Sequence, residues 1–212
     1  MKKREIQLAL YSRHFHNPSR RGVATYAHEL TWALAKLLQV TKVNLLDCFW
    51  PRGNFAFLPR IKQNNFETKV FRCPGRIVDT LNKNVGWPRV EMLCGDIEIM
   101  HVMHEQVPVN KAKNIIMTVH DMGPLLHPAL FAPNFRDQWQ ASLDKGLEMA
   151  TKVIGVSETV ENQLRAYRPE FSEKYTSTFL GVSKHFLHYD ASEDEKHFRL
   201  SKGIDFPHIL YI

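Results

Sequence analysis

Residues 152–164, KVIGVSETVENQL, start with a short apolar run and continue into a more polar segment. We interpret KVIGVS (152–157) as a buried strand that leads into a helix near 158–167. The apolar run NIIMTVH (114–120) predicts an earlier strand, and a long helix is predicted over 134–150, with Asn134 as its N-cap. Because a strand, a helix and a second strand follow one another, the sequence predicts a βαβ unit with parallel strands.

The same alternation of strands and helices extends through most of the chain. A helix is predicted from about 22 to 39, where apolar residues recur at helical spacing. Further strands are predicted at 6–12, 42–49, 68–73, 96–102 and 175–180. The predicted fold class is α/β, with a doubly wound, mostly parallel, Rossmann-like sheet and helices on both faces. Two segments rich in proline, aromatic and basic residues, 50–67 and 74–92, interrupt the alternation.

The last part of the chain differs from the rest. Residues 190–202 are polar and predict a linker helix, and HILYI (208–212) predicts a further strand. We therefore expect a Rossmann-like domain over 1–188 and a linker over 189–207. Residues 208–212 would be the first strand of a C-terminal domain that this chain lacks.

The composition, with 44% hydrophobic and 24% charged residues among 212, is that of a soluble globular protein. No apolar run approaches the ~18–20 residues of a membrane span, and the first residues do not form a signal peptide. The three cysteines, Cys48, Cys73 and Cys94, are an odd and scattered set, which argues against a disulfide framework. A cytoplasmic protein is the expectation.

The charge is unevenly distributed along the chain. Residues 1–90 contain 16 Lys and Arg against 5 Asp and Glu, whereas residues 91–212 contain 12 against 17. This asymmetry indicates a polyanionic partner or an anionic surface for the first half. The alternative is a solvated basic face that only aids solubility.

Candidate site residues lie where predicted strands end, because ligands of open α/β sheets bind there. Arg21 and Gly22 form the turn before the first helix, whose N-terminus favours anions such as phosphate. His120 and Asp121 end the strand at 114–120. His120 is placed to hydrogen-bond a substrate hydroxyl or to act as an acid or base, and Asp121 to orient it or make its own polar contact. The alternatives are an ordinary turn and a histidine satisfied by backbone.

Two further sets of polar residues are candidates for a ligand or a metal contact. Ser157 and Glu158 end the strand at 152–157, where helix capping competes with a sugar or acceptor contact. The histidine pairs 14/16 and 101/104 suggest a metal, but the spacing places no third ligand, so no metal is expected. No Gly-x-Ser-x-Gly elbow is present, which argues against an esterase.

Three stretches together resemble the N-terminal half of family 4 glycosyltransferases, which have the GT-B architecture of two facing Rossmann-like domains. The first is RRGVATYAHELTWAL (20–34). The second is GDIEIMHV (95–102) followed by NIIMTVHDMGPLLHP (114–128). The third is KVIGVSETVENQL (152–164), continuing to TFLGVSKHF (178–186). Their order and spacing match the family as well, although the first turn has one glycine where the family often has two.

The resemblance implies a retaining, metal-independent transfer of a sugar from a nucleotide-sugar to a glycan or lipid-linked acceptor, as in envelope polysaccharide synthesis. It implies that Gly22 lies close to the donor phosphates and that His120 and Asp121 face the transferred sugar. The C-terminal domain of such enzymes holds most of the donor, so this chain alone is expected to be inactive.

The basic segment at 49–90 adds a prediction about the acceptor. Aromatic and basic residues interleave there, which suits a peripheral location on the inner face of an anionic membrane. The residues expected at this surface are Trp50, Arg60, Lys62, Arg76 and Trp87. One alternative function is a non-catalytic, basic membrane- or lipid-docking module. Another is nucleic-acid binding, which is not expected because no motif for it is visible.

Overall fold

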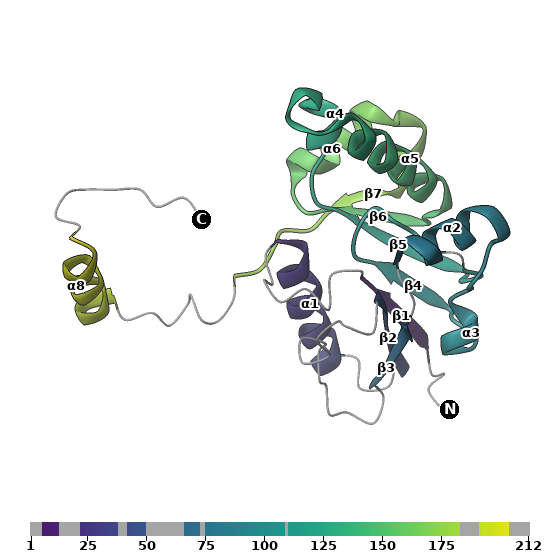
Figure 1. The fold of residues 1–212 in the computed structure, drawn as a ribbon, viewed down its shortest axis with the longest axis horizontal. Helices are drawn as coiled ribbons and strands as arrows, with labels where there is room; N and C mark the ends of the chain where they lie inside the picture. Colours follow the sequence, from purple (N-terminus) through teal and green to yellow (C-terminus); the bar gives the residue numbers. More distant parts are fainter. Residues whose placement is uncertain are drawn as a thin grey trace. The chain divides into compact units, whose positions relative to one another are not determined.

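The computed structural model describes residues 6–12, 22–37, 42–49, 66–72, 75–108, 110–182 and 191–203. Its centre is a seven-stranded sheet in the order β3-β2-β1-β4-β5-β6-β7 (Figure 1), and every neighbouring pair is parallel. The strands are β1 Gln7–Tyr11, β2 Lys42–Phe49, β3 Phe66–Arg72, β4 Ile99–Val102, β5 Asn114–Val119, β6 Lys152–Gly155 and β7 Tyr175–Ser177.

Helices cover the sheet on both faces, because alternate residues of its strands enter two separate apolar clusters. Leu8 and Leu10 of β1 pack with the helix α1 (Val23–Leu37), whereas Ala9 and Tyr11 belong to the cluster of α5 (Pro133–Met149) and α6 (Glu158–Tyr167). The remaining helices are α2 Gly75–Val85, α3 Glu91–Cys94, α4 Gly123–Leu126 and α8 Ala191–Lys202, with 3-10 turns η2 Pro128–Leu130 and η3 Pro169–Lys174. The predicted α/β, doubly wound, parallel fold is confirmed.

The local predictions differ in their outcome. All seven predicted strands and the helices at 22–39, 134–150 and 158–167 are present, with ends shifted by a few residues. Asn134 is not the N-cap of α5, because Ala132 occupies that position and Pro133 begins the helix. Proline suits the first helical position, where its missing N–H would have no partner within the helix. The structure also adds α2 inside a segment predicted only to interrupt the alternation.

The chain divides into two compact units, Met1–Leu180 and Gly181–Ile212. In the second unit the structure describes α8, a helix within the segment predicted to be a linker helix. The predicted domain limit at residue 188 and the predicted strand at 208–212 lie outside the described residues. No helix in the described ranges has the length and apolar character needed to cross a membrane.

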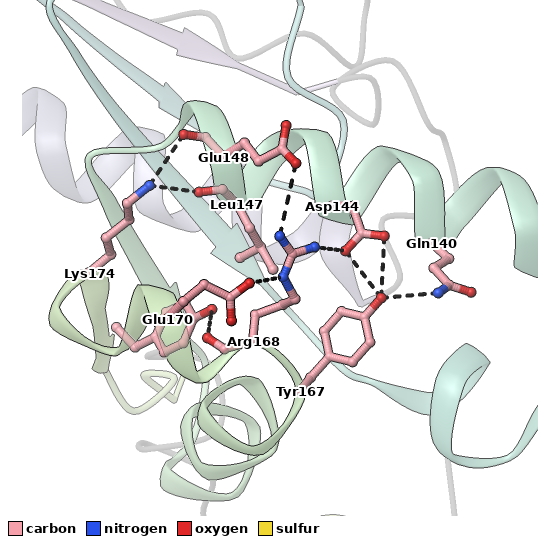
Figure 2. A network of polar contacts seen from close by, with 9 residues as sticks. Gln140, Asp144, Leu147, Glu148, Tyr167, Arg168, Glu170 and Lys174 are labelled. Atoms are coloured by element: carbon pink, nitrogen blue, oxygen red, sulfur yellow. Dashed lines mark hydrogen bonds and ion pairs between the residues drawn. The ribbon is translucent and has the colours of Figure 1, made fainter.

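A charged network joins the C-terminal ends of α5 and α6, where β6 and β7 begin (Figure 2). Arg168 donates from Nη1 to Asp144 Oδ1 at 2.8 Å and from Nε to Glu170 Oε1 at 2.6 Å. The Tyr167 hydroxyl donates to Asp144 at 3.1 Å and accepts from Gln140 Nε2 at 3.1 Å. These bonds tie the two helices together from their polar sides.

Lys174 completes this end of the molecule (Figure 2). Its Nζ donates to the carbonyl oxygens of Leu147 at 2.9 Å and Glu148 at 3.2 Å. These carbonyls belong to the last turn of α5, where backbone acceptors lack helical partners and the helix dipole favours a cation. Lys174 therefore caps α5 and holds η3 against it.

Candidate functional site at the carboxyl end of the sheet

The sheet has a topological switch point between β1 and β4. Strands β2 and β3 extend from β1 in one direction, while β4 to β7 continue in the other. In open parallel sheets, ligands bind beyond the carboxyl ends of the strands at such a point. The described polar residues at this edge come from the start of α1 and from the ends of β4 and β5.

Gly22 begins the first turn of α1 and leaves its surroundings open. Its φ is 51°, in the left-handed region that favours glycine, and no heavy atom of the described residues lies within 4 Å of the position a Cβ would occupy. Its carbonyl accepts from the Tyr26 N–H at 3.0 Å, which starts the helix. The described residues leave this backbone open, and the predicted approach of a phosphate stays a prediction. Arg21, the other residue predicted here, lies outside the described residues.

His120 follows β5 and is half-buried. Its Nε2 lies 3.0 Å from the Met103 carbonyl oxygen. Since a carbonyl only accepts, Nε2 carries a proton, and in the neutral ring Nδ1 has a lone pair. Within the described part of the chain, no residue hydrogen-bonds this Nδ1. Burial lowers the pKa of His120 from its ordinary 6.5, against smaller opposing effects of the Met103 carbonyl and Asp121. The ring is therefore neutral at pH 7 and can accept a hydrogen bond.

The environment of His120 includes a carboxyl group that the sequence did not single out. Glu105 Oε1 accepts from the His120 backbone N–H at 3.4 Å. Burial is the main cause that raises the pKa of Glu105, and the nearby charge of Asp121 adds to it. The sequence feature that could have pointed to Glu105 is its position as an acidic residue shortly after the end of β4, the strand beside β5.

Asp121 is exposed and makes its own polar contact. Its Oδ1 accepts from the Gly123 N–H at 2.8 Å, in the turn before α4. No described hydrogen bond joins the Asp121 carboxylate to the His120 ring, so of the two predicted roles the structure shows the polar contact. The pair lies together in sequence, but the two side chains have different partners.

Tyr26 links α1 to this site. Its ring packs edge-to-face on the His120 ring, with centroids 4.9 Å apart and an interplanar angle of 82°. Its hydroxyl is 3.1 Å from Thr118 Oγ1, and the same Thr118 oxygen is 2.9 Å from His101 Nε2. His101 is only 7% exposed, and burial lowers its pKa to about 4. A neutral polar chain therefore runs from His120 into the core.

His101 and His104, which the sequence suggests as a candidate metal-binding pair, have other hydrogen-bond partners. His101 bonds Thr118, and His104 Nδ1 accepts from the Gln106 N–H at 3.2 Å. Among the residues that the structure describes, no group of three His, Cys, Asp or Glu side chains could hold a metal ion. Positions 14 and 16 lie outside that part of the chain.

Ser157 caps α6. Its Oγ accepts from the Val160 N–H at 3.2 Å, and Glu158 is exposed in the first turn, where a carboxylate suits the helix dipole. A Cβ at Gly155 would lie 2.9 Å from the Glu161 nitrogen, so β6 and α6 meet too closely for a side chain. Helix capping, one of the two roles predicted for Ser157, is therefore confirmed. The other role, a sugar or acceptor contact, stays a prediction.

A second feature of the first unit is a set of exposed apolar residues on α2, on α3 and in the segment between them. We call it the α2–α3 surface, and its residues are Ile77, Val85, Trp87 and Met92. Their exposed fractions range from 41% for Trp87 to 67% for Val85. Arg76 lies in the first turn of α2. Arg76 and Trp87 were predicted to share a membrane or acceptor surface with Trp50, Arg60 and Lys62. These last three positions lie outside the described residues.

A scan against models of known protein families finds no match for this chain, and a search of the curated proteins finds no relative. The geometry of the site and the motifs in the sequence therefore carry the functional argument.

Proposed function

We propose that this chain is the acceptor-binding half of a retaining glycosyltransferase, which moves a sugar from a nucleotide-sugar to a glycan or lipid-linked acceptor. The observation that carries the proposal is the neutral His120 ring at the carboxyl end of β5, with Nδ1 available to a ligand. The His120 ring packs against the ring of Tyr26, and the Tyr26 backbone N–H donates to the Gly22 carbonyl at the start of α1. A group that accepts a sugar hydroxyl and a turn that admits phosphate thus belong to neighbouring elements.

The chemistry assigned to each group follows from its charge state. His120 Nδ1 accepts a hydrogen bond from a hydroxyl of the transferred sugar and holds that sugar during the reaction. The N-terminus of α1 at Gly22 stabilises negative charge on the donor phosphates. In the transfer, the bond between the anomeric carbon and the phosphate oxygen breaks, and the acceptor oxygen bonds to the same face. The departing phosphate oxygen takes the acceptor's proton, so neither His120 nor a metal needs to act as the base.

The proposal includes a second Rossmann-like domain of a GT-B enzyme, which would supply cations for the donor diphosphate. The first unit has its own parallel sheet and core, so we expect it to fold without that domain. It is not expected to catalyse, because developing phosphate charge needs positioned cations.

The test uses this chain and the longer protein that would contain the second domain. The longer protein should transfer sugar from one member of a nucleotide-sugar panel, and NMR of the product should show retained anomeric configuration. On the chain itself, the matching nucleotide-sugar at high concentration should shift the His120 Nδ1 resonance, because the transferred sugar is the group that Nδ1 would bind. Multiple-turnover transfer by this chain alone, or inversion in the product, would contradict the proposal.

The α2–α3 surface supports docking to the cytoplasmic leaflet, which a lipid-linked acceptor would require. Exposed apolar side chains on a segment that also carries basic residues in its sequence suit a membrane interface, where each cation near an anionic surface contributes about 1 kcal/mol. The same surface would serve the alternative function, a docking module without catalysis. That alternative predicts vesicle binding with no sugar transfer by the longer protein.

Vesicle co-sedimentation tests the docking. Binding should need anionic phosphatidylglycerol vesicles, weaken with salt, and fall for Arg76→Glu and for Trp87→Ser. Leu130→Ser is the matched control, because Leu130 is 79% exposed on a different surface. If the protein ignores anionic vesicles at low salt, the membrane location is wrong, while the transferase proposal remains.

A further inference from the structure

The His120 ring makes two contacts that come from different segments of the chain. The Met103 carbonyl holds Nε2 at 3.0 Å, and the Tyr26 ring meets the imidazole edge-to-face. The backbone carbonyl limits the position of one nitrogen, but one hydrogen bond does not define the plane of a ring. The aromatic contact restricts that plane, because a rotated imidazole would meet the Tyr26 ring.

Tyr26 is itself anchored at its far end. Its hydroxyl is 3.1 Å from Thr118 Oγ1, and burial raises the pKa of Tyr26, so the phenol stays neutral. Tyr26 stands on α1 and Thr118 on β5, and they are 92 positions apart in the sequence. This bond fixes how α1 approaches the strand that ends at His120.

Thr118 serves two neighbours with one hydroxyl. It is fully buried, and its Oγ1 is 2.9 Å from His101 Nε2 as well as within reach of Tyr26. A hydroxyl has one hydrogen and two lone pairs, so the Thr118 hydroxyl can bond both neighbours at once and the three groups form a directional chain. Loss of the Thr118 hydroxyl would remove this partner from buried His101 and from half-buried Tyr26.

We propose that Tyr26 and Thr118 are positioning residues for His120, and that buried His101 is the fixed end of the chain that orients them. Tyr26 transmits this order through its ring, and none of the three needs to touch a substrate. The consequence for sugar transfer rests on the proposed function, whereas the consequence for the His120 ring does not.

The first experiment measures the His120 ring without any substrate. Two-dimensional ¹⁵N NMR of the histidine rings reports the tautomer and pKa of His120 in the chain. In Thr118→Val the tautomer preference should weaken, and the pKa should rise toward the ordinary histidine value of about 6.5. Thr118→Ser retains the hydroxyl and should keep the wild-type signature.

Tyr26 gives a second pair of variants in case Thr118→Val does not fold. Tyr26→Phe keeps the ring and removes the anchor, and Tyr26→Leu also removes the ring. The change at His120 should increase from wild type through Phe to Leu. A wild-type tautomer and pKa in folded Thr118→Val, or in both folded Tyr26 variants, would overturn the proposal and leave these residues as core packing.

The second experiment measures transfer by the longer protein. Thr118→Val should lower kcat by roughly 10-fold with little change in KM, because misplacing a positioned group costs rate rather than binding. Thr118→Ser should recover most of the rate. If NMR shows the expected loss of order but the wild-type protein transfers no sugar, the proposed function fails and the positioning role stands. If Thr118→Val retains the wild-type kcat, the proposal is wrong for catalysis.

Discussion

The two ends of the parallel sheet use polar residues in opposite ways. Where β6 and β7 begin, the partly exposed Arg168 pairs with the carboxylates of Asp144 and Glu170 (Figure 2). Where β4 and β5 end, His101 and His120 are neutral because burial lowers their pKa. The charges at the first end pair with partners within the protein, whereas at the second end no described residue hydrogen-bonds His120 Nδ1.

Under the proposed function, this difference separates residues that stabilise the fold from residues that act on a ligand. Charges at the first end bond to opposite charges, to a tyrosine hydroxyl and to helix carbonyls, so they have little capacity left for a ligand. Neutral groups at the second end are buried at a cost, which proteins commonly tolerate where function requires it. Mutations at the first end should therefore affect folding, and mutations at the second should affect activity or acid sensitivity.

The largest expected effect is on catalysis at the second end. Under the proposed function, His120→Ala in the longer protein should lower kcat by ~100-fold, about 3 kcal/mol, because it would remove a positioned group that acts as charge develops on the sugar. Initial rates over a range of donor and acceptor concentrations measure the effect. An activity within a factor of two of wild type would assign His120 to structure.

Arg168→Met is the control at the opposite end. It breaks the pair with Asp144 at 2.8 Å but lies away from the switch point of the sheet. It should leave kcat unchanged while lowering the melting temperature. If both variants changed the same property, the division between the two ends would be wrong.

The second prediction concerns acid. In the unfolded chain His101 takes up a proton near pH 6.5, but in the folded protein only near pH 4, so the unfolded state binds more protons between these values. Stability therefore falls as pH falls through this window and is unaffected by this group above it. The loss reaches about 3 kcal/mol by pH 4. Urea unfolding at a series of pH values measures it.

His101→Gln should flatten this pH dependence, whatever it does to stability at pH 7. Its matched control is His127→Asn, since His127 is exposed and its replacement should leave the slope unchanged. An unchanged slope in His101→Gln would show that other groups cause the acid sensitivity.

The third prediction tests close packing at the carboxyl end of β6. Gly155→Ala should destabilise the protein by about 2 kcal/mol, because the new methyl group would lie 2.9 Å from the backbone nitrogen of Glu161. Gly181→Ala, where no described residue lies within 4 Å of the added Cβ, should change stability by less than ~0.5 kcal/mol. Equal effects measured by urea unfolding would contradict the close approach of β6 and α6.

The smallest effect is expected in the charged network. Arg168→Met should cost about 1 kcal/mol at low salt and less at high salt, because the pair with Asp144 is only partly shielded from water. Arg136→Met removes a longer contact to exposed Asp137, at 3.4 Å, and should be close to neutral. An effect of Arg168→Met that did not depend on salt would indicate lost packing rather than lost charge pairing.

Features that depend on neighbouring residues could be predicted from the sequence. Apolar periodicity predicted the seven strands, three of the helices and the doubly wound parallel sheet, because both periods follow from local backbone geometry. Ser157 was predicted as a cap because its bond reaches only three residues ahead, to Val160. The prediction of Asn134 as an N-cap was wrong, because Pro133 begins the helix and the N-cap is Ala132, two residues before the predicted position.

The site depends on contacts that no local pattern encodes. The positions of Gly22 and His120 at strand ends followed from the order of elements, since parallel strands end at one edge. The sequence could not show that Tyr26 bonds Thr118, that Thr118 bonds His101, or that Glu105 reaches the His120 backbone. These pairs are 15 to 92 positions apart. Sequence periodicity determined the sheet, but only the tertiary packing of α1 against β4 and β5 decided the partners and charge states of these side chains, because burial and long-range contacts set both.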